Sequence, residues 1–164
     1  MNINLAEFLK EYNTEIPDSI RCGEIFRLTY SDKLDHITFY ANYEKLVPSE
    51  DIFLFEKTVE EVFQVEKMRL SCRYPSEIFG MDCYHELLKL LKRDVSVVNG
   101  FLDDADVRMS EGRIDISIVH GGLDILNKFD FCGRFSRLIY NQFGLKTEIT
   151  LTGDSSVSDE EYDK

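Results

Sequence analysis

Residues 106–120 read DVRMSEGRIDISIVH, and apolar side chains alternate with polar ones on both sides of Gly112. Alternation with a period of two is typical of strands that bury one face, and a short turn containing glycine joins two such strands into a hairpin. Isoleucines at every second position mark the buried face of the second strand. The sequence therefore predicts paired strands at Asp106–Ser110 and Arg113–His120.

Helical patterns lie on both sides of this hairpin. Leucines at helical spacing predict a helix over Asp82–Arg93, before the first strand. A short apolar segment, Val95–Leu102, predicts one or two further helical turns around Gly100. Gly121 and Gly122 break the second strand, and two helical stretches and a last strand follow. The order of this half is α-β-β-α-α-β, and its last three elements are expected at Leu123–Lys128, Phe131–Phe143 and Leu145–Leu151.

The first half of the chain carries a similar pattern. A short amphipathic helix precedes two alternating runs rich in aromatic and β-branched residues, and a longer helix and a third such run follow. Ser49 is the predicted N-cap of the longer helix, with acidic residues in the first turn, where the helix dipole favours them. The order of this half is α-β-β-α-β. We expect its elements at Asn4–Glu11, Glu24–Tyr30, His36–Tyr43, a helix that starts after Ser49 and includes Phe63, and Glu66–Tyr74.

Strands joined by short hairpins and backed by helices predict an α+β fold, built here twice in tandem. Each half would be a small sandwich in which helices pack on one face of a three-stranded sheet. We place a first domain at residues 1–75, a second domain at residues 76–152, and an acidic linker or tail at residues 153–164. The pattern leaves open whether the sheets of the two halves merge.

The composition of the chain indicates which classes of protein are compatible with it. The 164-residue chain has 31 acidic and 19 basic residues, a net charge of −12, and is 43% hydrophobic. The apolar fraction is enough for a folded core, and the charge disfavours sequence-independent nucleic-acid binding, which depends on Lys and Arg that neutralise phosphates. The first residues lack the apolar run of a signal peptide, and no stretch is long enough for a membrane span. Four cysteines without a Cys-x-x-Cys pair favour a reducing, cytoplasmic location.

Two groups of residues have the chemistry of metal ligands: Asp103, Asp104 and Asp106, and Cys72, Cys83 and His85. Acids between a helix and a strand usually form a solvated turn, which is how we interpret the first group. The second group lacks the close pairs in which zinc ligands normally occur. The sequence has no Gly-x-Ser-x-Gly or Walker-type loop either, so we expect no catalytic residues, no metal ligands and no cofactor in this segment.

The α-β-β-α-α-β order of the second half is the topology of a type II KH domain. Such domains clamp a nucleic-acid backbone with a Gly-x-x-Gly loop between two adjacent helices. The corresponding residues here, 127–130, read NKFD and contain no glycine. We therefore predict a KH-like shape without the backbone clamp.

The chain is acidic overall, but one group of basic residues is expected to lie together. Lys67, Arg69 and Arg73 alternate with apolar residues along one predicted strand, so they share its outward face. Arg27 and Tyr40 are expected on the same exposed sheet face. Cations beside an aromatic ring could dock a phosphate backbone or an acidic protein, and they also fit an ordinary solvated face. These three interpretations stay open at this point.

Short motifs in both halves, together with their order, point to one family. In the first half they are Gly23-Glu24-Ile25-x-x-Leu28, Leu46-Val47-Pro48 and Val62-Phe63. In the second half they are Glu111-Gly112-Arg113 before Ile114-Asp115-Ile116, and Tyr140-x-Gln142-Phe143-Gly144. An acidic stretch follows Gly153, where that family has a charged linker. Over about residues 5–160 the chain resembles the N-terminal region of the PolC-type DNA polymerase III alpha subunit, the Gram-positive-type replicase.

The resemblance implies a large parent enzyme that adds deoxynucleotides to a primer. Its 3′–5′ proofreading exonuclease, OB domain and metal-binding PHP region would all lie C-terminal to this segment, and its divalent metal ions would be bound there. The first of the two N-terminal domains is similar to the polymerase-binding domain of the clamp-loader tau subunit, and the second is KH-like.

The expected function is therefore a non-catalytic module that tethers or positions the polymerase in the replisome. Its partners would be replisome proteins, clamp-loader components among them, with at most weak DNA binding and no membrane contact. The alternative is a single-stranded nucleic-acid-binding module that uses the exposed sheet faces. Arg27, Tyr40, Lys67, Arg69 and Arg73 are the residues we expect to contact the partner or the nucleic acid.

Overall fold

The computed structural model of the chain describes residues 2–95 and 100–153. The chain divides into two compact units, of which the first ends at Ile78 and the second begins at Phe79. The division that we predict after residue 75 lies close to this boundary. The acidic segment predicted at the C-terminal end lies, from residue 154 on, outside the described residues.

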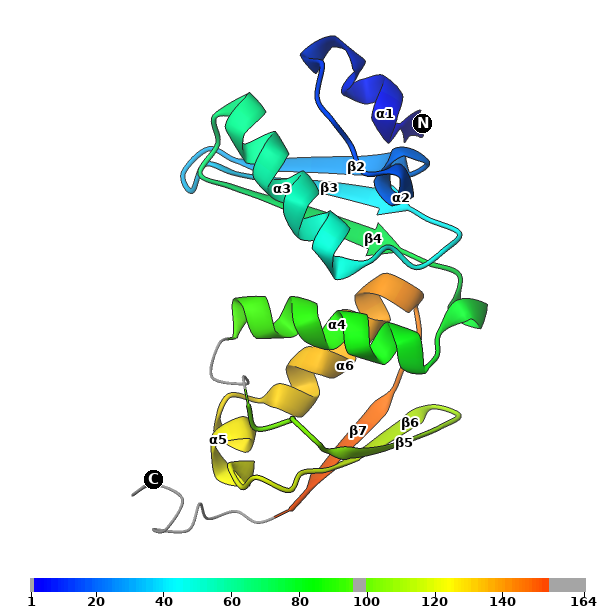
Figure 1. Cartoon of the computed structure of the whole chain (residues 1–164), viewed down its shortest axis with the longest axis vertical. Helices are drawn as coiled ribbons and strands as arrows, with labels where there is room; N and C mark the ends of the chain where they lie inside the picture. The colour runs from blue at the N-terminus through cyan, green and yellow to red at the C-terminus, as the bar shows by residue number, and fades with distance from the viewer. Residues whose placement is uncertain (1, 96–99, 154–164) are drawn as a thin grey trace. The chain divides into compact units, whose positions relative to one another are not determined.

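The first unit is a four-stranded sheet with helices packed on it (Figure 1). The strand order is β1-β2-β3-β4, in which β3 is antiparallel to β2 and parallel to β4. The predicted α+β class is confirmed. The elements are β1 (Ile3–Asn4), α1 (Leu5–Phe8), η1 (Lys10–Tyr12), α2 (Asp18–Arg21), β2 (Glu24–Ser31), β3 (His36–Asn42), α3 (Ser49–Phe63), β4 (Lys67–Arg73) and η2 (Ser76–Ile78).

This sheet has one strand more than the three that the sequence predicts. β1 is two residues long; its Asn4 pairs with Glu24, and the Asn4 side chain accepts a hydrogen bond from the Glu7 N–H (3.0 Å) at the start of α1. A two-residue strand shows no alternation and α2 is a single turn, so neither produces a periodic signal. α3 begins at Ser49 with Pro48 as its N-cap, so the prediction of Ser49 as the N-cap is wrong by one residue.

An aromatic cluster forms the core of the first unit. Phe39 on β3 is fully buried. The centroid of its ring lies 5.6 Å from that of Phe8, 6.4 Å from that of Phe55 and 6.3 Å from that of Phe63. Inclined ring contacts of this kind add to the free energy gained by burying apolar area. The cluster holds α1 and α3 on one face of the sheet, which leaves the opposite face available for other contacts.

The second unit is a three-stranded sheet with helices packed on it (Figure 1). The strand order is β5-β6-β7, with β6 antiparallel to β5 and parallel to β7. The predicted order α-β-β-α-α-β is confirmed, and α5 and α6 have the predicted bounds. The elements are α4 (Met81–Asp94), β5 (Asp106–Ser110), β6 (Arg113–Ser117), α5 (Leu123–Lys128), α6 (Phe131–Phe143) and β7 (Glu148–Thr152).

Some details of the second unit differ from the predictions, among them the last strand, because β7 spans Glu148–Thr152 rather than Leu145–Leu151. β6 ends at Ser117 rather than at His120, because Gly121 and Gly122 turn the chain with left-handed φ angles of 76° and 89°. Of the predicted helical segment Val95–Leu102, residues 96–99 lie outside the described residues. The remainder forms a turn that starts at Gly100, whose φ of 90° also favours glycine.

The core of the second unit is again aromatic. Phe135 on α6 is fully buried, with its ring centroid 5.5 Å from Tyr84 on α4 and 5.6 Å from Phe131. Ile114 and Ile116 on β6 are buried beneath these helices, as the alternation of the hairpin predicts. Both units therefore fold by the same rule, in which helices cover the apolar face of a small sheet.

The correspondence between the units extends to single positions. In each unit the second strand of a hairpin pairs in parallel with the strand that follows the long helix, so β4 and β7 occupy equivalent edge positions. Phe55 lies eight residues before Phe63, the last residue of α3, and Phe135 lies eight residues before Phe143, the last residue of α6. Equivalent residues of α3 and α6 can therefore be compared by counting back from the helix end.

Candidate partner-binding face of the first sheet

The strand register decides which side chains share the exposed face of the first sheet. Arg27 lies opposite Tyr40, and Asn42 lies beside Arg73. Because successive side chains of a strand point to opposite faces, these residues lie on the face opposite to the buried Phe39. The structure therefore places Arg27, Tyr40 and Arg73 on the predicted face.

Two guanidinium groups and two rings form a continuous row on this face. The guanidinium carbon of Arg73 lies 4.6 Å from the ring centroid of Phe26, and that of Arg27 lies 5.0 Å from the ring centroid of Tyr40. The two rings are 6.2 Å apart. Cation–π contacts of this length hold the guanidinium groups against the sheet. We call Phe26, Arg27, Tyr40 and Arg73 the cation–aromatic face.

Phe26 is the member of this face that the sequence analysis missed. A β-bulge between Ile25 and Arg27 inserts Phe26 as an extra residue, so that Phe26 and Arg27 both contact Tyr40. Strict alternation cannot predict this arrangement, because a bulge shifts the side-chain pattern by one position. One signal was present: Ile25 and Leu28, which share the core-facing register, are three positions apart instead of two.

The remaining two predicted residues lie apart from this row. Lys67 is exposed at the other end of β4, beside His36. The Arg69 guanidinium turns toward α3, where its Nη1 lies 3.8 Å from Glu56 Oε1 and donates a hydrogen bond to the Met68 carbonyl (3.2 Å). Arg69 therefore has a structural partner, and the cation–aromatic face consists of residues from β2, β3 and the end of β4.

Carboxylates of α3 close the outer edge of β4. Glu56, which is only 3% exposed, accepts a hydrogen bond from the Leu70 N–H (2.8 Å), and Glu60 accepts one from the Met68 N–H (3.2 Å). These are N–H groups that an additional strand would otherwise use, and blocking such groups prevents edge-to-edge pairing. The Met68 and Leu70 N–H groups are therefore not available to an added strand at the edge of β4.

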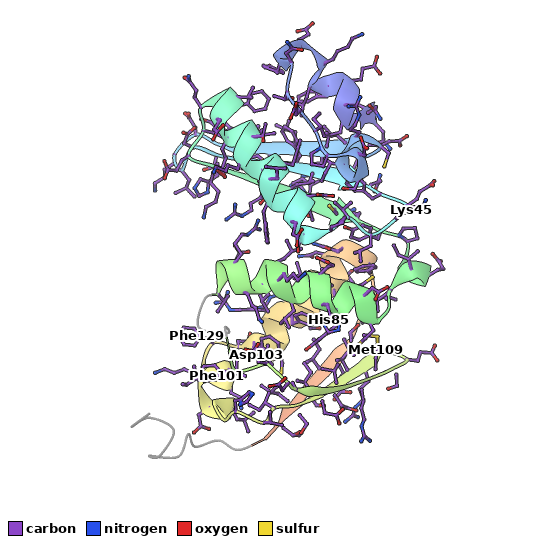
Figure 2. The ribbon with its side chains drawn as sticks, in the orientation of Figure 1. Lys45, His85, Phe101, Asp103, Met109 and Phe129 are labelled. Carbon is purple, nitrogen blue, oxygen red and sulfur yellow. The ribbon has the colours of Figure 1, made fainter. Side chains whose placement is uncertain are left out.

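The two groups of potential metal ligands do not assemble in the structure. The aspartates each meet a different neighbour: Lys92 Nζ lies 3.7 Å from Asp103, His120 Nε2 lies 3.2 Å from Asp104, and Arg108 Nε lies 3.4 Å from Asp106. Cys83 is buried, whereas His85, which is two residues later on α4 and labelled in Figure 2, is exposed. Cys72 belongs to the other unit. Within residues 2–95 and 100–153, no three His, Cys, Asp or Glu side chains group together as a metal site.

Three of the cysteine thiols have the surroundings of unreactive, structural side chains. Burial raises the pKa of the Cys72 thiol to about 12, and it also raises the pKa values of Cys83 and Cys132. A nucleophilic cysteine needs the opposite shift, because the thiolate is the reactive form. These three thiols are therefore protonated at neutral pH and act as small apolar side chains.

The Cys72 thiol makes the stability of the first unit depend on alkaline pH. An acid whose pKa is higher in the folded chain than its ordinary value of 9.0 adds stability below that value and loses this contribution as the pH rises toward about 12. We expect urea unfolding above about pH 9 to show a loss of about 1.4 kcal/mol per pH unit from this group alone. Cys72→Ala should remove that part of the slope; an unchanged slope would contradict the burial of the thiol proton.

The junction between α5 and α6 has no backbone clamp for nucleic acid. Phe129, labelled in Figure 2, and Asp130 connect the two helices, and the Asp130 carboxylate lies 3.4 Å from Arg137 Nη2. A carboxylate at this position would repel a phosphate group. The KH-like topology of the second unit is therefore present without the loop chemistry that binds a phosphate backbone.

The comparisons with known proteins do not assign a function, so the function is inferred from the geometry of this chain. No family model, no curated protein and no solved structure matches this chain. Among the described residues, no helix is long and apolar enough to cross a membrane. The cation–aromatic face places two exposed guanidinium groups on one face of the first sheet, in a protein with a net charge of −12.

Proposed function

We propose that this chain is a non-catalytic interaction module from the N-terminal end of a PolC-type DNA polymerase III alpha subunit. In this role it positions the polymerase among cytoplasmic replisome proteins, clamp-loader components included, and it carries no catalytic or metal-binding residues of its own. The motifs in both halves and the two tandem α+β units support this proposal. The parent enzyme would supply DNA synthesis, proofreading and divalent metal ions from its other domains.

The cation–aromatic face is the main observation that supports this proposal. Arg27 and Arg73 are exposed, and neither pairs with a carboxylate in the described part of the chain. Exposed cations held against rings, on a protein with a net charge of −12, favour an acidic partner by electrostatic complementarity. The bound partner would gain charge-assisted contacts with two guanidinium groups that are already ordered.

The same geometry favours a protein over single-stranded nucleic acid. Single-strand binders stack bases on open aromatic faces. On this sheet a guanidinium group lies over the Phe26 ring and another lies over the Tyr40 ring, so both rings already have a stacking partner. A base would have to displace an arginine before it could stack. An acidic protein surface needs no such displacement.

A binding experiment with a charge-matched control tests the proposal. The full chain would be titrated against purified clamp-loader complex, first unmodified and then with Arg27→Glu and Arg73→Glu together. We expect the double variant to bind at least about tenfold more weakly, since two charge-assisted contacts are lost. The control variant, Lys33→Glu with Lys45→Glu, changes the charge equally at exposed positions outside the face and should bind as the unmodified chain does.

An oligothymidylate titration with varied salt separates the two functions. If the face binds phosphates, the logarithm of the association constant should fall with the logarithm of salt concentration by about 0.7 per phosphate contact. We expect no measurable binding to the oligonucleotide at low salt. Tight, salt-dependent binding that the Arg27 and Arg73 substitutions abolish would replace the proposed function by the single-strand alternative. Equal clamp-loader binding by the face variant and the control would also contradict the proposal.

A further inference from the structure

The outer edge of the second sheet differs from that of the first. β7 lies at this edge, and two hydrogen bonds fix its orientation: the Glu148 N–H donates to the Gly112 carbonyl (2.9 Å) and the Thr152 carbonyl accepts from the Ile118 N–H (2.8 Å). In a parallel pair, alternate residues face the neighbouring strand. The N–H and C=O groups of Ile149 and Leu151, which lie between these residues, therefore point away from β6 toward the open edge.

The side chains that close the edge of β4 have no counterparts on α6. Glu56 and Glu60 stand seven and three residues before Phe63, and the same positions before Phe143 hold Ser136 and Tyr140. The Ser136 hydroxyl donates to the Thr147 carbonyl (2.7 Å) instead of accepting from β7, and Tyr140 is 53% exposed. In the described part of the chain, neither the Ile149 N–H nor the Leu151 N–H has an acceptor.

A groove lies where these carboxylates would be. Its volume is about 550 Å³, and it is lined by Gly112, by Ser136, Arg137 and Tyr140 of α6, and by residues 146–148 at the start of β7. The groove therefore places an exposed aromatic side chain beside the start of β7, directly before the open-edge groups of Ile149. That combination is what a peptide needs in order to add a strand to a sheet and anchor an alternate side chain.

The basic side chains around the groove favour a negatively charged ligand. Arg137 and Lys146 line it and are exposed, and the Arg137 contact with Asp130 is a surface pair, with both side chains 65% exposed. Such surface pairs contribute little and are readily exchanged. Glu148 also lines the groove, beside its register partner Arg113, whose pKa is raised first by the hydrogen bond and charge of Asp115 and then by the charge of Glu148. Two cations thus remain available to an acidic ligand.

We propose that the open edge of β7 and this groove bind an extended acidic segment of a partner protein, which adds a fourth strand to the second sheet. The main chain of the segment would pair with the edge groups of Ile149 and Leu151, and its carboxylates would meet Arg137 and Lys146. This inference goes beyond the proposed function, because it rests on a different sheet and does not depend on the parent enzyme or on the cation–aromatic face.

A peptide with a designed hydrogen-bonding pattern tests strand addition directly. The probe is a fluorescein-labelled peptide of alternating valine and glutamate, titrated against the full chain by fluorescence anisotropy. In one variant of the peptide, methyl groups on the backbone nitrogens of every second residue remove the N–H groups that would face β7. In the other variant, the nitrogens of the remaining residues are methylated, so the N–H groups that would face β7 are kept. We expect one methylated peptide to lose binding at least tenfold and the other to bind as the parent does. Equal affinities for the two methylated peptides, or no binding of the parent peptide, would overturn the proposal.

A substitution on α6 should close the edge in the way that α3 closes β4. Tyr140→Glu places a carboxylate at the position of Glu60, and Tyr140→Gln places a neutral side chain of similar size there. We expect Tyr140→Glu to weaken the probe at least tenfold and Tyr140→Gln to weaken it less, while Glu50→Gln, at an exposed position of α3, leaves it unchanged. Tyr140 is half exposed, and the thermal unfolding of each variant verifies that the fold is kept.

Two further readouts distinguish a partner segment from other occupants. Amide hydrogen exchange of the full chain should slow at Ile149 and Leu151 when the probe is added, which a contact with the groove alone would not cause. Light scattering should show the chain as a monomer. A dimer that Tyr140→Glu converts into a monomer would mean that a second copy of the chain occupies the edge, and this result would overturn the proposal of an acidic partner segment.

Discussion

Phe39→Ala is expected to lower the free energy of unfolding of the first unit by about 3–5 kcal/mol. The Phe39 side chain is fully buried, and rings from α1 and from α3 meet it at centroid distances of 5.6–6.4 Å. Alanine would leave a cavity at the point where both helices meet the sheet. In a unit of this size, a loss of that magnitude is comparable to the whole free energy of folding.

Urea unfolding followed by circular dichroism measures this effect. Leu54→Ala serves as the control, because Leu54 is on the same helix as Phe55 but is 58% exposed, and its truncation should change the free energy of unfolding by no more than about 0.5 kcal/mol. If Phe39→Ala were as mild as Leu54→Ala, the aromatic cluster would not be the core of the first unit.

The second large effect is expected at Glu56. Glu56→Ala would remove the acceptor of the Leu70 N–H and the carboxylate beside Arg69, and we expect a loss of about 2–3 kcal/mol. Glu56→Gln keeps an oxygen for the Leu70 N–H and should cost clearly less. The exposed Glu61 lies on the same helix, and Glu61→Ala should have little effect.

Denaturant titrations of these three variants decide whether the edge carboxylate is structural. The decisive comparison is between the losses of unfolding free energy caused by Glu56→Ala and by Glu56→Gln. Their difference separates loss of the hydrogen-bond acceptor from loss of the charge. Equal, small effects of all three variants would show that Glu56 does not close the edge of β4.

Much of the fold could be predicted because its signals are local. The alternation around Gly112 predicts both strands of the β5–β6 hairpin, and the apolar stripes predict α5 and α6 with the bounds that the structure shows. The elements that were missed, β1 and α2, are too short for any periodicity to appear. Local patterns thus predict the order of the elements, while the number of strands in the first sheet depends on a pairing between Asn4 and Glu24 that no local pattern indicates.

The candidate site was predictable only in part, because its geometry depends on contacts between elements. Alternation placed Arg27, Tyr40 and Arg73 on the exposed face, and the register agrees. The bulge that brings Phe26 to this face and the turn of Arg69 toward Glu56 arise from tertiary packing. Glu56 itself occurs on an amphipathic helix as one of several acids, and only the structure shows that it is buried.

The contrast between the two sheet edges is likewise a property of the assembled fold. No pattern in the sequence relates Ser136 and Tyr140 to a sheet edge, and this relation is visible only when α6 is compared with α3 position by position. One edge is closed by carboxylates and one is open beside a groove.

The proposed function depends most on contact between the cation–aromatic face and a replisome protein. The direct test is an NMR titration of the chain, labelled with nitrogen-15, in which the Nε–Hε signals of the arginines are followed as the purified tau subunit is added. We predict that the signals of Arg27 and Arg73 shift together and saturably, while that of Arg108, on the second sheet, stays in place. Binding of the tau subunit that leaves the Arg27 and Arg73 signals unchanged would contradict this contact and the proposed function.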